Sequence, residues 1–464
     1  MLFSSITFLY YFLPITLLVY FLVPKRMKNP VLLLISLIFY AWGEPRYVLI
    51  MIVSIIVGYA AGRLIETFYE TKYAKYILAG IVLVHLGIFI YFKYTDFIIG
   101  NLNRLTGNAY RLLNIALPIG ISFYTFQILS YELDVYRGKV KAQKNPIYLA
   151  TYISMFPQLI AGPIVRYSDI QTQLEVRKSD YENIALGIRR FIIGLGKKVL
   201  IANTLGELCE IFKVSEDLSL LYFWLYAISF TLHIYYDFSG YSDMAIGLGK
   251  ILGFDFMENF NYPYISKSVT EFWRRWHMSL GQWFRDYVYI PLGGNRCSKA
   301  RWILNIVFVW FLTGFWHGAQ WNFALWGLYF ALLLIIEKMW LGHLLEKNAI
   351  IGHVYLCIIV VIGFVLFNAS SLFDAAEYIG AMFGWGKYPL VSAEFIYYMK
   401  SYVLILVIGL IGATPVINQA ARKVEQKLGK MAAVWEIVIL IGIFVLSTAY
   451  LVDGSFNPFL YFRF

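Results

Sequence analysis

The stretch MLFSSITFLYYFLPITLLVYFLVP, Met1 to Pro24, contains no charged side chain and is long enough to cross a lipid bilayer as one helix. Three basic residues, Lys25, Arg26 and Lys28, follow it directly. A cleavable signal peptide has the opposite order, with basic residues before the apolar run and small residues after it. The stretch therefore predicts a retained first span, with its N-terminus outside and the basic residues in the cytoplasm.

The composition extends this prediction to the whole chain. Hydrophobic residues make up 60% of the 464 residues and charged residues only 14%, whereas soluble domains carry about 25% charge. The apolar runs are continuous and long rather than alternating, which excludes a β-barrel. We expect an all-α polytopic membrane protein, with roughly ten to twelve transmembrane helices plus re-entrant and interfacial helices around a central polar tunnel.

Apolar runs of spanning length, or near it, recur along the sequence. They lie around residues 2–24, 29–43, 46–62, 76–92, 112–130, 146–165, 189–206, 218–236, 302–316, 321–338, 353–371, 402–419 and 434–452. The run 146–165 contains Pro157 and the Ala-Gly-Pro of 161–163, so we expect a broken or re-entrant helix there. The basic loops around 137–144 and 422–430 should be cytoplasmic. One span follows the second loop, which predicts that both termini lie outside and that the number of spans is even.

The net charge of +11 has two explanations. The basic residues are spread over several loops, which is typical of the positive-inside bias and leaves no block suited to nucleic acid. A cytoplasmic entrance rich in lysine and arginine would also attract a molecule that carries phosphate groups. The three cysteines, Cys209, Cys297 and Cys357, have neither metal-ligand spacing nor an even count, so they predict no disulfide framework.

The least lipid-like part of the chain is residues 237–296. Ser268 and Glu271 match a capping box, which predicts that a helix begins near Val269. One face of that helix would carry four apolar side chains, those of Phe272, Trp276, Leu280 and Trp283. This spacing predicts an amphipathic helix at the membrane interface. The sequence PLGGN at 291–295 then predicts a turn.

Two of the six histidines directly follow a tryptophan. His277 lies within residues 237–296, and His317 lies shortly after them. Ionisable groups at membrane depth are costly and usually mark a working site. His317 ends the apolar run 303–316 and lies between Gly314 and Gly318, which permit a close approach of substrate or backbone. An imidazole, with a pKa of about 6.5, suits a general base at neutral pH. Either histidine could instead be a hydrogen-bonded core residue.

Neighbouring side chains complete the candidate site. The candidate substrate-binding residues are Trp273, Arg274, Trp276, Arg285, Asp286, Trp316, Gln320 and Asn322. The aromatic residues could equally serve packing, and the arginines could be interface anchors or partners of the nearby carboxylates. The chain has no zinc-protease, phosphate-loop, nucleophile-elbow or dinucleotide motif, and the histidines lack a third ligand, so we expect no metal site.

The last residues, DGSFNPFLYFRF at 453–464, are too apolar for a free tail in water. The tail either packs along the membrane face or tucks into the protein and presents Tyr461. A phenol oxygen is a suitable acyl carrier, because a phenolate with a pKa of about 10 is a better leaving group than an alkoxide.

Six short motifs complete the pattern. They are DFSGYSDMA at 237–245, NFNYP at 259–263, FWRRWHMSL at 272–280, WFRDY at 283–287, PLGGNR at 291–296 and FWHG at 315–318. Together they resemble the membrane-bound O-acyltransferase family. The similarity is greatest to the bacterial branch with the membrane subunits of alginate O-acetylation, peptidoglycan O-acetylation and teichoic-acid D-alanylation. The N-terminal opening and YAWG at 40–43 are also similar, so the resemblance covers nearly the whole chain.

The resemblance implies roles by position. His317 matches the family's catalytic histidine, and His277 matches the second histidine of its signature. FLYFRF at 459–464 is similar to a C-terminal motif whose tyrosine carries the acyl group, which maps to Tyr461. PLGGNR is typical of the members that O-acetylate polysaccharides. The tyrosine motif belongs to this chain rather than to a separate small peptide, so the resemblance favours acetyl-CoA over a carrier protein as donor.

The resemblance therefore implies a single acyltransferase domain, 1–464, in the bacterial cytoplasmic membrane, with a polar catalytic core at 237–322 and an extracytoplasmic tail at 453–464. Acetyl-CoA would be the donor, with no permanently bound cofactor. The partner would be an extracytoplasmic Ser-His-Asp hydrolase-like (SGNH) protein, and the acceptor a cell-surface or secreted polysaccharide. Acyl or D-alanyl transfer to teichoic acid is the alternative within this class. A multi-span transporter and a scaffold that recruits the partner enzyme are alternatives from other classes.

Overall fold

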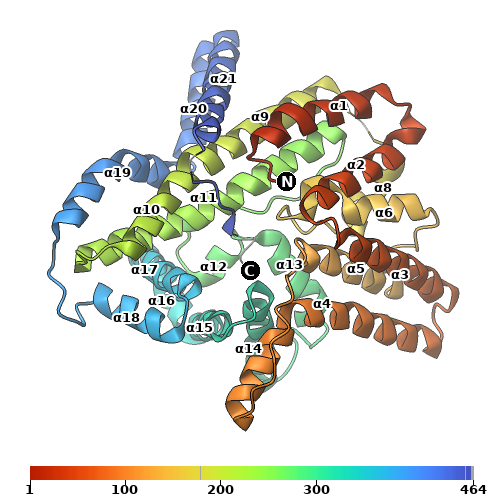
Figure 1. Ribbon diagram of the computed structural model, residues 1–464, viewed down its shortest axis with the longest axis horizontal. Coiled ribbons are helices and arrows are strands. Elements are labelled where there is room, and N and C mark those ends of the chain that lie inside the picture. The colour runs from red at the N-terminus through yellow and green to blue at the C-terminus, as the bar shows by residue number, and fades with distance from the viewer. Residues whose placement is uncertain (178, 455, 461–464) are drawn as a thin grey trace. The chain divides into compact units, whose positions relative to one another are not determined.

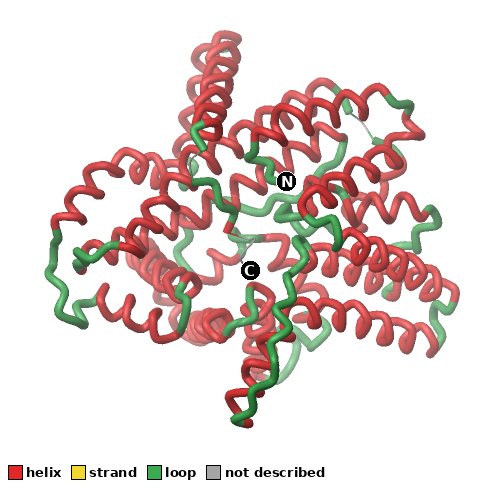
Figure 2. The backbone as a smooth tube through the Cα atoms, in the orientation of Figure 1, coloured by secondary structure: helices red, strands yellow, loops and turns green. Residues whose placement is uncertain are grey.

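The computed structural model describes residues 1–177, 179–454 and 456–460. Within these ranges the chain is helical and forms no strand (Figure 2), which confirms the all-α fold. The chain divides into two compact units. Unit 1 holds Met1–Phe191 and Met244–Met257, and unit 2 holds Ile192–Asp243 and Glu258–Phe464. The polar core expected at 237–322 is divided by this boundary, because 244–257 belongs to unit 1 while both candidate histidines belong to unit 2.

Unit 1 begins with the helical turns η1 (Phe8–Phe12) and η2 (Lys25–Met27). Its helices are α1 (Leu13–Leu22), α2 (Lys28–Gly43), α3 (Val48–Thr67), α4 (Lys72–Thr106), α5 (Ile121–Tyr136), α6 (Pro146–Ser154), α7 (Phe156–Leu159) and α8 (Tyr167–Glu175). Phenylalanine rings form part of its core: Phe8, Phe39 and Phe156 are mutual neighbours, with ring centroids 5.5 Å to 6.3 Å apart. Such rings provide much of the buried apolar area of a core.

Two apolar runs of unit 1 show how far the sequence predicts helices. The run 146–165 is broken as expected, because α6 ends at Ser154 and α7 is a separate short helix. Gln158 donates to the carbonyl of Tyr152 at 2.5 Å, which satisfies a backbone group that the break leaves without a helical partner. The run 112–130 is helical only from Ile121 onward.

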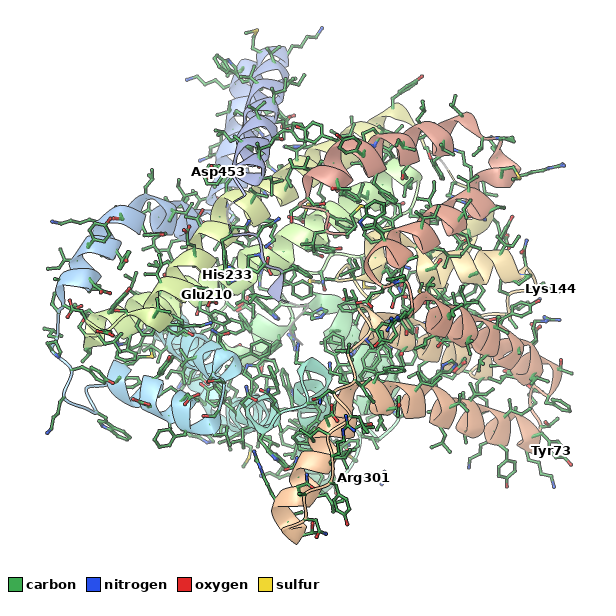
Figure 3. The ribbon with its side chains drawn as sticks, viewed as in Figure 1. Tyr73, Lys144, Glu210, His233, Arg301 and Asp453 are labelled. Carbon is green, nitrogen blue, oxygen red and sulfur yellow. The ribbon has the colours of Figure 1, made fainter. Side chains whose placement is uncertain are left out.

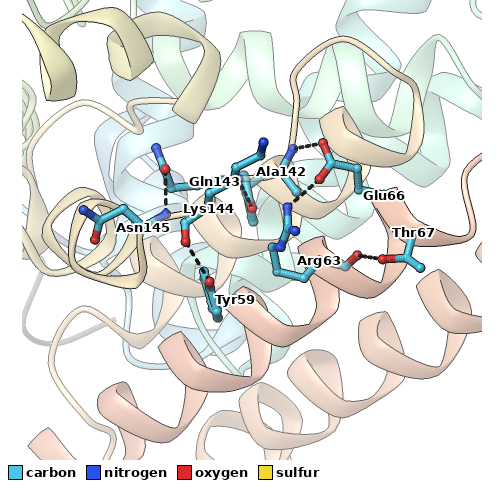
Figure 4. A network of polar contacts seen from close by, with 9 residues as sticks. Tyr59, Arg63, Glu66, Thr67, Ala142, Gln143, Lys144 and Asn145 are labelled. Carbon is cyan, nitrogen blue, oxygen red and sulfur yellow. Dashed lines mark hydrogen bonds and ion pairs between the residues drawn. The ribbon is translucent and has the colours of Figure 1, made fainter.

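A polar network joins the end of α3 to the basic loop before α6 (Figure 4). Glu66 accepts hydrogen bonds from Arg63 at 2.6 Å and from the backbone N–H of Ala142 at 3.1 Å. Tyr59 donates to the carbonyl of Lys144 at 2.8 Å. The loop is therefore held on helix α3 by bonds to its own backbone.

Unit 2 contains the remaining helices, two of which it shares with unit 1. Helix α9 (Tyr181–Gly196) begins in unit 1 and continues through the π-helical segment η3 (Lys197–Ala202) into α10 (Asn203–Val214). Helix α11 (Leu220–Leu252) begins in unit 2 and ends in unit 1. The others are η4 (Pro263–Ile265), α12 (Val269–Trp273), α13 (Met278–Phe284), η5 (Arg285–Tyr289), α14 (Lys299–His317), α15 (Trp321–Ile336), η6 (Glu337–Leu341), α16 (Gly342–Lys347), α17 (Ala349–Asn368), α18 (Leu372–Met382), α19 (Ala393–Gly412), α20 (Val416–Leu428) and α21 (Lys430–Val452).

Six helices among the described residues are long and apolar enough to cross a membrane. They are Val48–Thr67, Lys72–Thr106, Trp321–Lys347, Ala349–Asn368, Ala393–Gly412 and Lys430–Val452. The first apolar helix, Phe8–Leu22, is shorter. Together with other apolar helices these spans define a multi-pass membrane protein. The basic segment expected as a loop before the last span is itself helix α20, which pairs with α21 in a hairpin that projects from the rest of unit 2 (Figure 1).

Candidate active site

His277 occupies a left-handed turn between α12 and α13. Its backbone lies at φ 44° and ψ 51°, a conformation that few residues other than glycine adopt. The expected cap is correct, because the Ser268 hydroxyl accepts from the N–H of Glu271 at 3.1 Å. The expected continuous amphipathic helix from Val269 is wrong, since α12 ends at Trp273 and α13 begins at Met278. The apolar stripe is still buried: Phe272, Trp276, Leu280 and Trp283 are each at most 5% exposed.

The side chain of Asn259 holds this turn. Its Oδ1 atom lies 3.1 Å from Nδ1 of His277 and accepts from Ser279 through both the hydroxyl, at 2.9 Å, and the backbone N–H, at 3.3 Å. The N–H of Met278 donates to the Asn259 carbonyl at 3.0 Å. A backbone N–H can only donate, so the atom that faces it is the amide oxygen, and Nδ1 of His277 must carry the ring proton. In the neutral ring the basic nitrogen is then Nε2.

Aromatic rings enclose the imidazole of His277. Phe238 on α11 meets it edge-on with the ring centroids 4.7 Å apart, and Trp316 lies 5.9 Å away. The turn lies outside the six candidate spans. Burial lowers the pKa of His277 well below its usual value, and the neighbouring His317 lowers it further. His277 is therefore neutral at pH 7.

His317 is the last residue of α14 and is fixed by close helix packing. A Cβ atom added to Gly314 would lie 2.2 Å from the carbonyl oxygen of Phe323 on α15. A Cβ atom added to Gly327 of α15 would likewise lie 2.2 Å from the carbonyl oxygen of Trp310. The two glycines therefore allow direct backbone contact between α14 and α15. Gly318, which ends α14, has the ring of Phe323 against it. Gly314 thus allows the close backbone approach expected from the sequence, and Gly318 leaves room for the Phe323 ring.

Three aromatic rings surround His317. Their centroids lie 5.0 Å away for Trp316, 5.2 Å for Trp326 and 5.4 Å for Phe367, and each meets the imidazole nearly at right angles. They come from α14, α15 and α17 respectively. Since Trp316 also faces His277, both histidines adjoin one indole ring. Two imidazoles from segments forty residues apart in sequence thus belong to one aromatic-walled site.

The predicted tryptophans belong to the packing around this site. Trp273 meets Trp326, a neighbour of His317, at 5.5 Å. Trp276 packs against Phe364 at 5.1 Å and is 3% exposed. Both are therefore part of the aromatic cluster that carries the histidines.

The charged and amide candidates lie differently. Arg274, Arg285 and Gln320 are exposed, and Arg285 is 3.8 Å from Asp286. Asn322 is buried and donates to the carbonyl of Ala369 at 3.0 Å, which ties the start of α15 to the end of α17. The structure thus brings the predicted aromatic residues to the histidines and leaves these arginines and Gln320 at the surface.

Tyr461 lies outside the described residues. The tail as far as Leu460 tucks into unit 2, where Phe459 is 3% and Leu460 6% exposed. Of the two arrangements expected for the tail, burial in the protein is therefore correct for this part.

Three polar features of unit 2 were missed as site residues. One is Asn259. Another is Glu337, whose carboxylate accepts from the backbone N–H groups of Val269 at 2.6 Å and Thr270 at 2.9 Å and so anchors α12. The third is the buried ion pair of Lys198 and Asp237. The signal that could have found Glu337 and Lys198 is a charged side chain within a largely apolar helical run.

The fold and this site define the class of the protein. The model of the membrane-bound O-acyltransferase family matches residues 37–371, and the chain belongs to that family. It is an O-acyltransferase, as the motifs around the two histidines predict.

Particular relatives are similar over most of their length. The chain is 38% identical to a probable alginate O-acetylase of Azotobacter vinelandii over 499 residues, which cover 100% of both chains. It is 42% identical to a probable alginate O-acetylase of Pseudomonas aeruginosa, over 84% of this chain and 76% of that one. It is 33% identical to a peptidoglycan O-acetyltransferase of Helicobacter pylori, over 83% of this chain and 80% of that one.

Proposed function

We propose that this protein moves an acetyl group from cytoplasmic acetyl-CoA across the membrane for the O-acetylation of a polysaccharide. One observation carries the proposal: His277 and His317 adjoin the same Trp316 ring in a buried, aromatic-walled site. Such a site excludes water, which would otherwise hydrolyse a thioester. The relatives named as acetylases of alginate and of peptidoglycan support acetyl as the acyl group and a polysaccharide as the acceptor.

His317 would act as the general base. It would take the proton of an attacking hydroxyl while the hydroxyl oxygen forms a bond to the thioester carbonyl carbon. The bond between that carbon and sulfur then breaks, and the CoA thiolate leaves and takes up the proton. Its position at a helix end, fixed by backbone packing, supports this role, because a base must be held in a constant geometry.

His277 would position the thioester on its cytoplasmic approach. A neutral ring whose Nδ1–H faces Asn259 accepts rather than donates at Nε2. It therefore suits positioning better than polarisation of the thioester carbonyl, which would need a donor.

Tyr461 would be the first acceptor. Its phenol oxygen would take the acetyl group from CoA as an ester and later release it, as phenolate, to an acceptor hydroxyl on the outer side. The burial of Phe459 and Leu460 inside unit 2 supports a tail that enters the protein. A Ser-His-Asp hydrolase-like protein outside the cytoplasmic membrane would then place the acetyl group on the glycan, and both termini would be extracytoplasmic.

Two other functions are less well supported. D-alanyl transfer to teichoic acid would use the same two histidines, but the acetylase relatives cover more than four fifths of this chain. A transporter predicts solute flux without covalent chemistry and leaves the paired Trp-His motifs without a role. A scaffold predicts that His317→Ala is harmless.

The test is peptide mass spectrometry on the purified protein after incubation with acetyl-CoA in the absence of any partner. We expect an added acetyl group on the peptide that holds Tyr461, and its loss in His317→Ala. His343→Ala is the matched control, because His343 is exposed on α16. Tyr461→Phe should remove the adduct without loss of acetyl-CoA binding.

An absent adduct in a folded protein that binds acetyl-CoA would contradict the relay and mean direct transfer to the acceptor. An adduct that persists in His317→Ala would contradict the role of His317 as base.

A further inference from the structure

A buried ion pair in unit 2 joins two helical segments. The Nζ atom of Lys198 is 2.7 Å from Oδ1 of Asp237, and both side chains are completely inaccessible to solvent. Lys198 belongs to the π-helical segment η3, and Asp237 to α11. Burying two charges costs several kcal/mol per ion unless further hydrogen bonds satisfy them. The other hydrogen bonds that Lys198 and Asp237 make therefore indicate the role of the ion pair.

Both partners of the ion pair bind the backbone of the C-terminal tail. The Lys198 ammonium donates to the carbonyl of Pro458 and, at 2.8 Å, to Oδ1 of Asn203. On the other side, Oδ2 of Asp237 accepts from the N–H of Leu460 at 3.0 Å. One ion pair thus holds the tail at two points, two residues apart.

Side-chain contacts also fix the tail in place. Asn203 donates to Oδ1 of Asn457 at 3.1 Å. The ring of Phe459 lies 4.6 Å from that of Tyr241, and its centroid is 6.0 Å from the Lys198 ammonium. These contacts come from η3, α10 and α11. His233 of α11, labelled in Figure 3, has its Nδ1 2.6 Å from the carbonyl of Ala202 in η3.

The next residue on α11 belongs to the histidine site. Phe238 follows Asp237 directly, and its ring forms one wall around His277 at 4.7 Å. The helix that binds the tail at Asp237 therefore also supplies a wall of the histidine site. The residue after Leu460 is Tyr461.

We propose that Lys198 and Asp237 form a clamp that holds residues 457–460 inside unit 2, and that acetyl transfer through the next residue, Tyr461, requires this clamp. They are positioning residues, since they act through the tail and not on the acetyl group. The clamp itself rests on the contacts above. Its consequence for acetyl transfer rests on the proposed function.

A second ion pair in the same two segments provides matched controls. Lys197 lies next to Lys198, and Asp243 lies in the same DFSGYSD motif as Asp237. Their charged atoms are also 2.7 Å apart, but the side chains are 25% and 14% exposed, respectively. Lys197→Met and Asp243→Asn therefore remove the same charges at neighbouring positions without removing the bonds to Pro458 and Leu460.

The experiment measures carboxypeptidase digestion of the full-length protein in detergent, with the purification tag at the N-terminus and intact-mass detection. In the parent protein digestion should stop before Phe459 and Leu460 are removed. In Lys198→Met and in Asp237→Asn their removal should be at least tenfold faster, and the ester-linked acetate of the cell polysaccharide should fall at least tenfold. Lys198→Arg, which keeps the charge, should retain part of the protection.

Single substitutions leave one buried charge unpaired and could prevent folding. The double variant Lys198→Met/Asp237→Asn avoids this, because neither charge remains. It should fold, expose the tail and lose acetylation, whereas Lys197→Met/Asp243→Asn should do neither.

The outcomes test the clamp and the acetyl relay separately. A tail that stays protected in the folded double variant would overturn the clamp, whatever happens to acetylation. An exposed tail with unchanged acetylation would overturn the requirement of the clamp for acetyl transfer. Lost acetylation in His317→Ala with a protected tail is expected, and it separates a failure of the chemistry from a failure of the clamp.

Discussion

His277 and His317 lie against one tryptophan ring but are held there by opposite means. His317 ends a helix whose backbone touches that of α15 through Gly314 and Gly327. His277 occupies a strained left-handed turn held mainly by the polar groups of Asn259. Backbone packing tolerates the loss of a side chain but not the addition of a methyl group. The turn at His277 is sensitive instead to the loss of a side chain, because removal of the Asn259 amide removes the hydrogen bonds that hold the turn.

The largest expected effect is that of Gly314→Ala. The added Cβ would lie 2.2 Å from a backbone oxygen that cannot move aside, so α14 and α15 must separate. Overpacking of this kind costs about 1–3 kcal/mol, occasionally more. We expect a clear fall in melting temperature and at least a hundredfold loss of acetyl transfer.

The control for Gly314→Ala is Gly442→Ala on α21, where no atom lies within 4 Å of the added Cβ. Its melting temperature should be unchanged or raised, since alanine favours a helix over glycine by about 1 kcal/mol. A Gly314→Ala protein with parental stability and activity would show that close packing does not fix His317.

The second effect should come from Asn259→Leu. It removes the acceptor of Nδ1 of His277 and of two donors of Ser279. Buried donors without partners cost about 1–3 kcal/mol, so we expect a lower melting temperature and at least a tenfold loss of transfer. Asn261→Leu is the control, because Asn261 is exposed. Equal activity of the two variants would mean that Asn259 does not hold the site.

This contrast also explains what the sequence could predict. Local signals were reliable: the Ser268 cap, the apolar stripe of α12 and α13, and the broken helix at 146–165 all depend on residues close in sequence. The turn at His277 was not predictable from its neighbours, because Asn259 acts from eighteen residues upstream. A helical pattern of apolar residues continues through that turn, since both short helices bury the same face.

The charged candidates show the same dependence on tertiary contacts. Arg274 and Arg285 lie in the right segment, but their side chains are exposed. Lys198 lies far from the motif in sequence and reaches it only through α11. The motifs predicted the two histidines as candidates, and the structure places both beside the Trp316 ring. The partners that hold them depend on tertiary contacts that one sequence does not reveal.

A third test uses pH. The pKa of His277 is lowered by burial and then by His317, whereas the unfolded chain has a pKa of about 6.5. Below about pH 6.5 the unfolded state therefore binds more protons, and the folded state loses stability as the pH falls. The slope for one proton is at most about 1.4 kcal/mol per pH unit.

Melting temperatures between pH 7.5 and 5 should accordingly fall on acidification, and the fall should be smaller in His277→Asn. An identical pH profile in that variant would contradict the assignment of the proton uptake to His277.

The smallest expected effect is a difference in stability between asparagine and alanine variants, with opposite signs at positions 277 and 317. At 277 the backbone is left-handed, a region that asparagine tolerates better than alanine, so His277→Asn should be the more stable variant by about 0.5–1 kcal/mol. At 317 the residue belongs to a helix, where alanine is favoured over asparagine by about 0.6 kcal/mol. Thermal unfolding of the four variants measures both differences. Alanine favoured at both positions would mean that the turn at 277 is not left-handed in the folded protein, and the contrast between the two histidines would then rest on Asn259 alone.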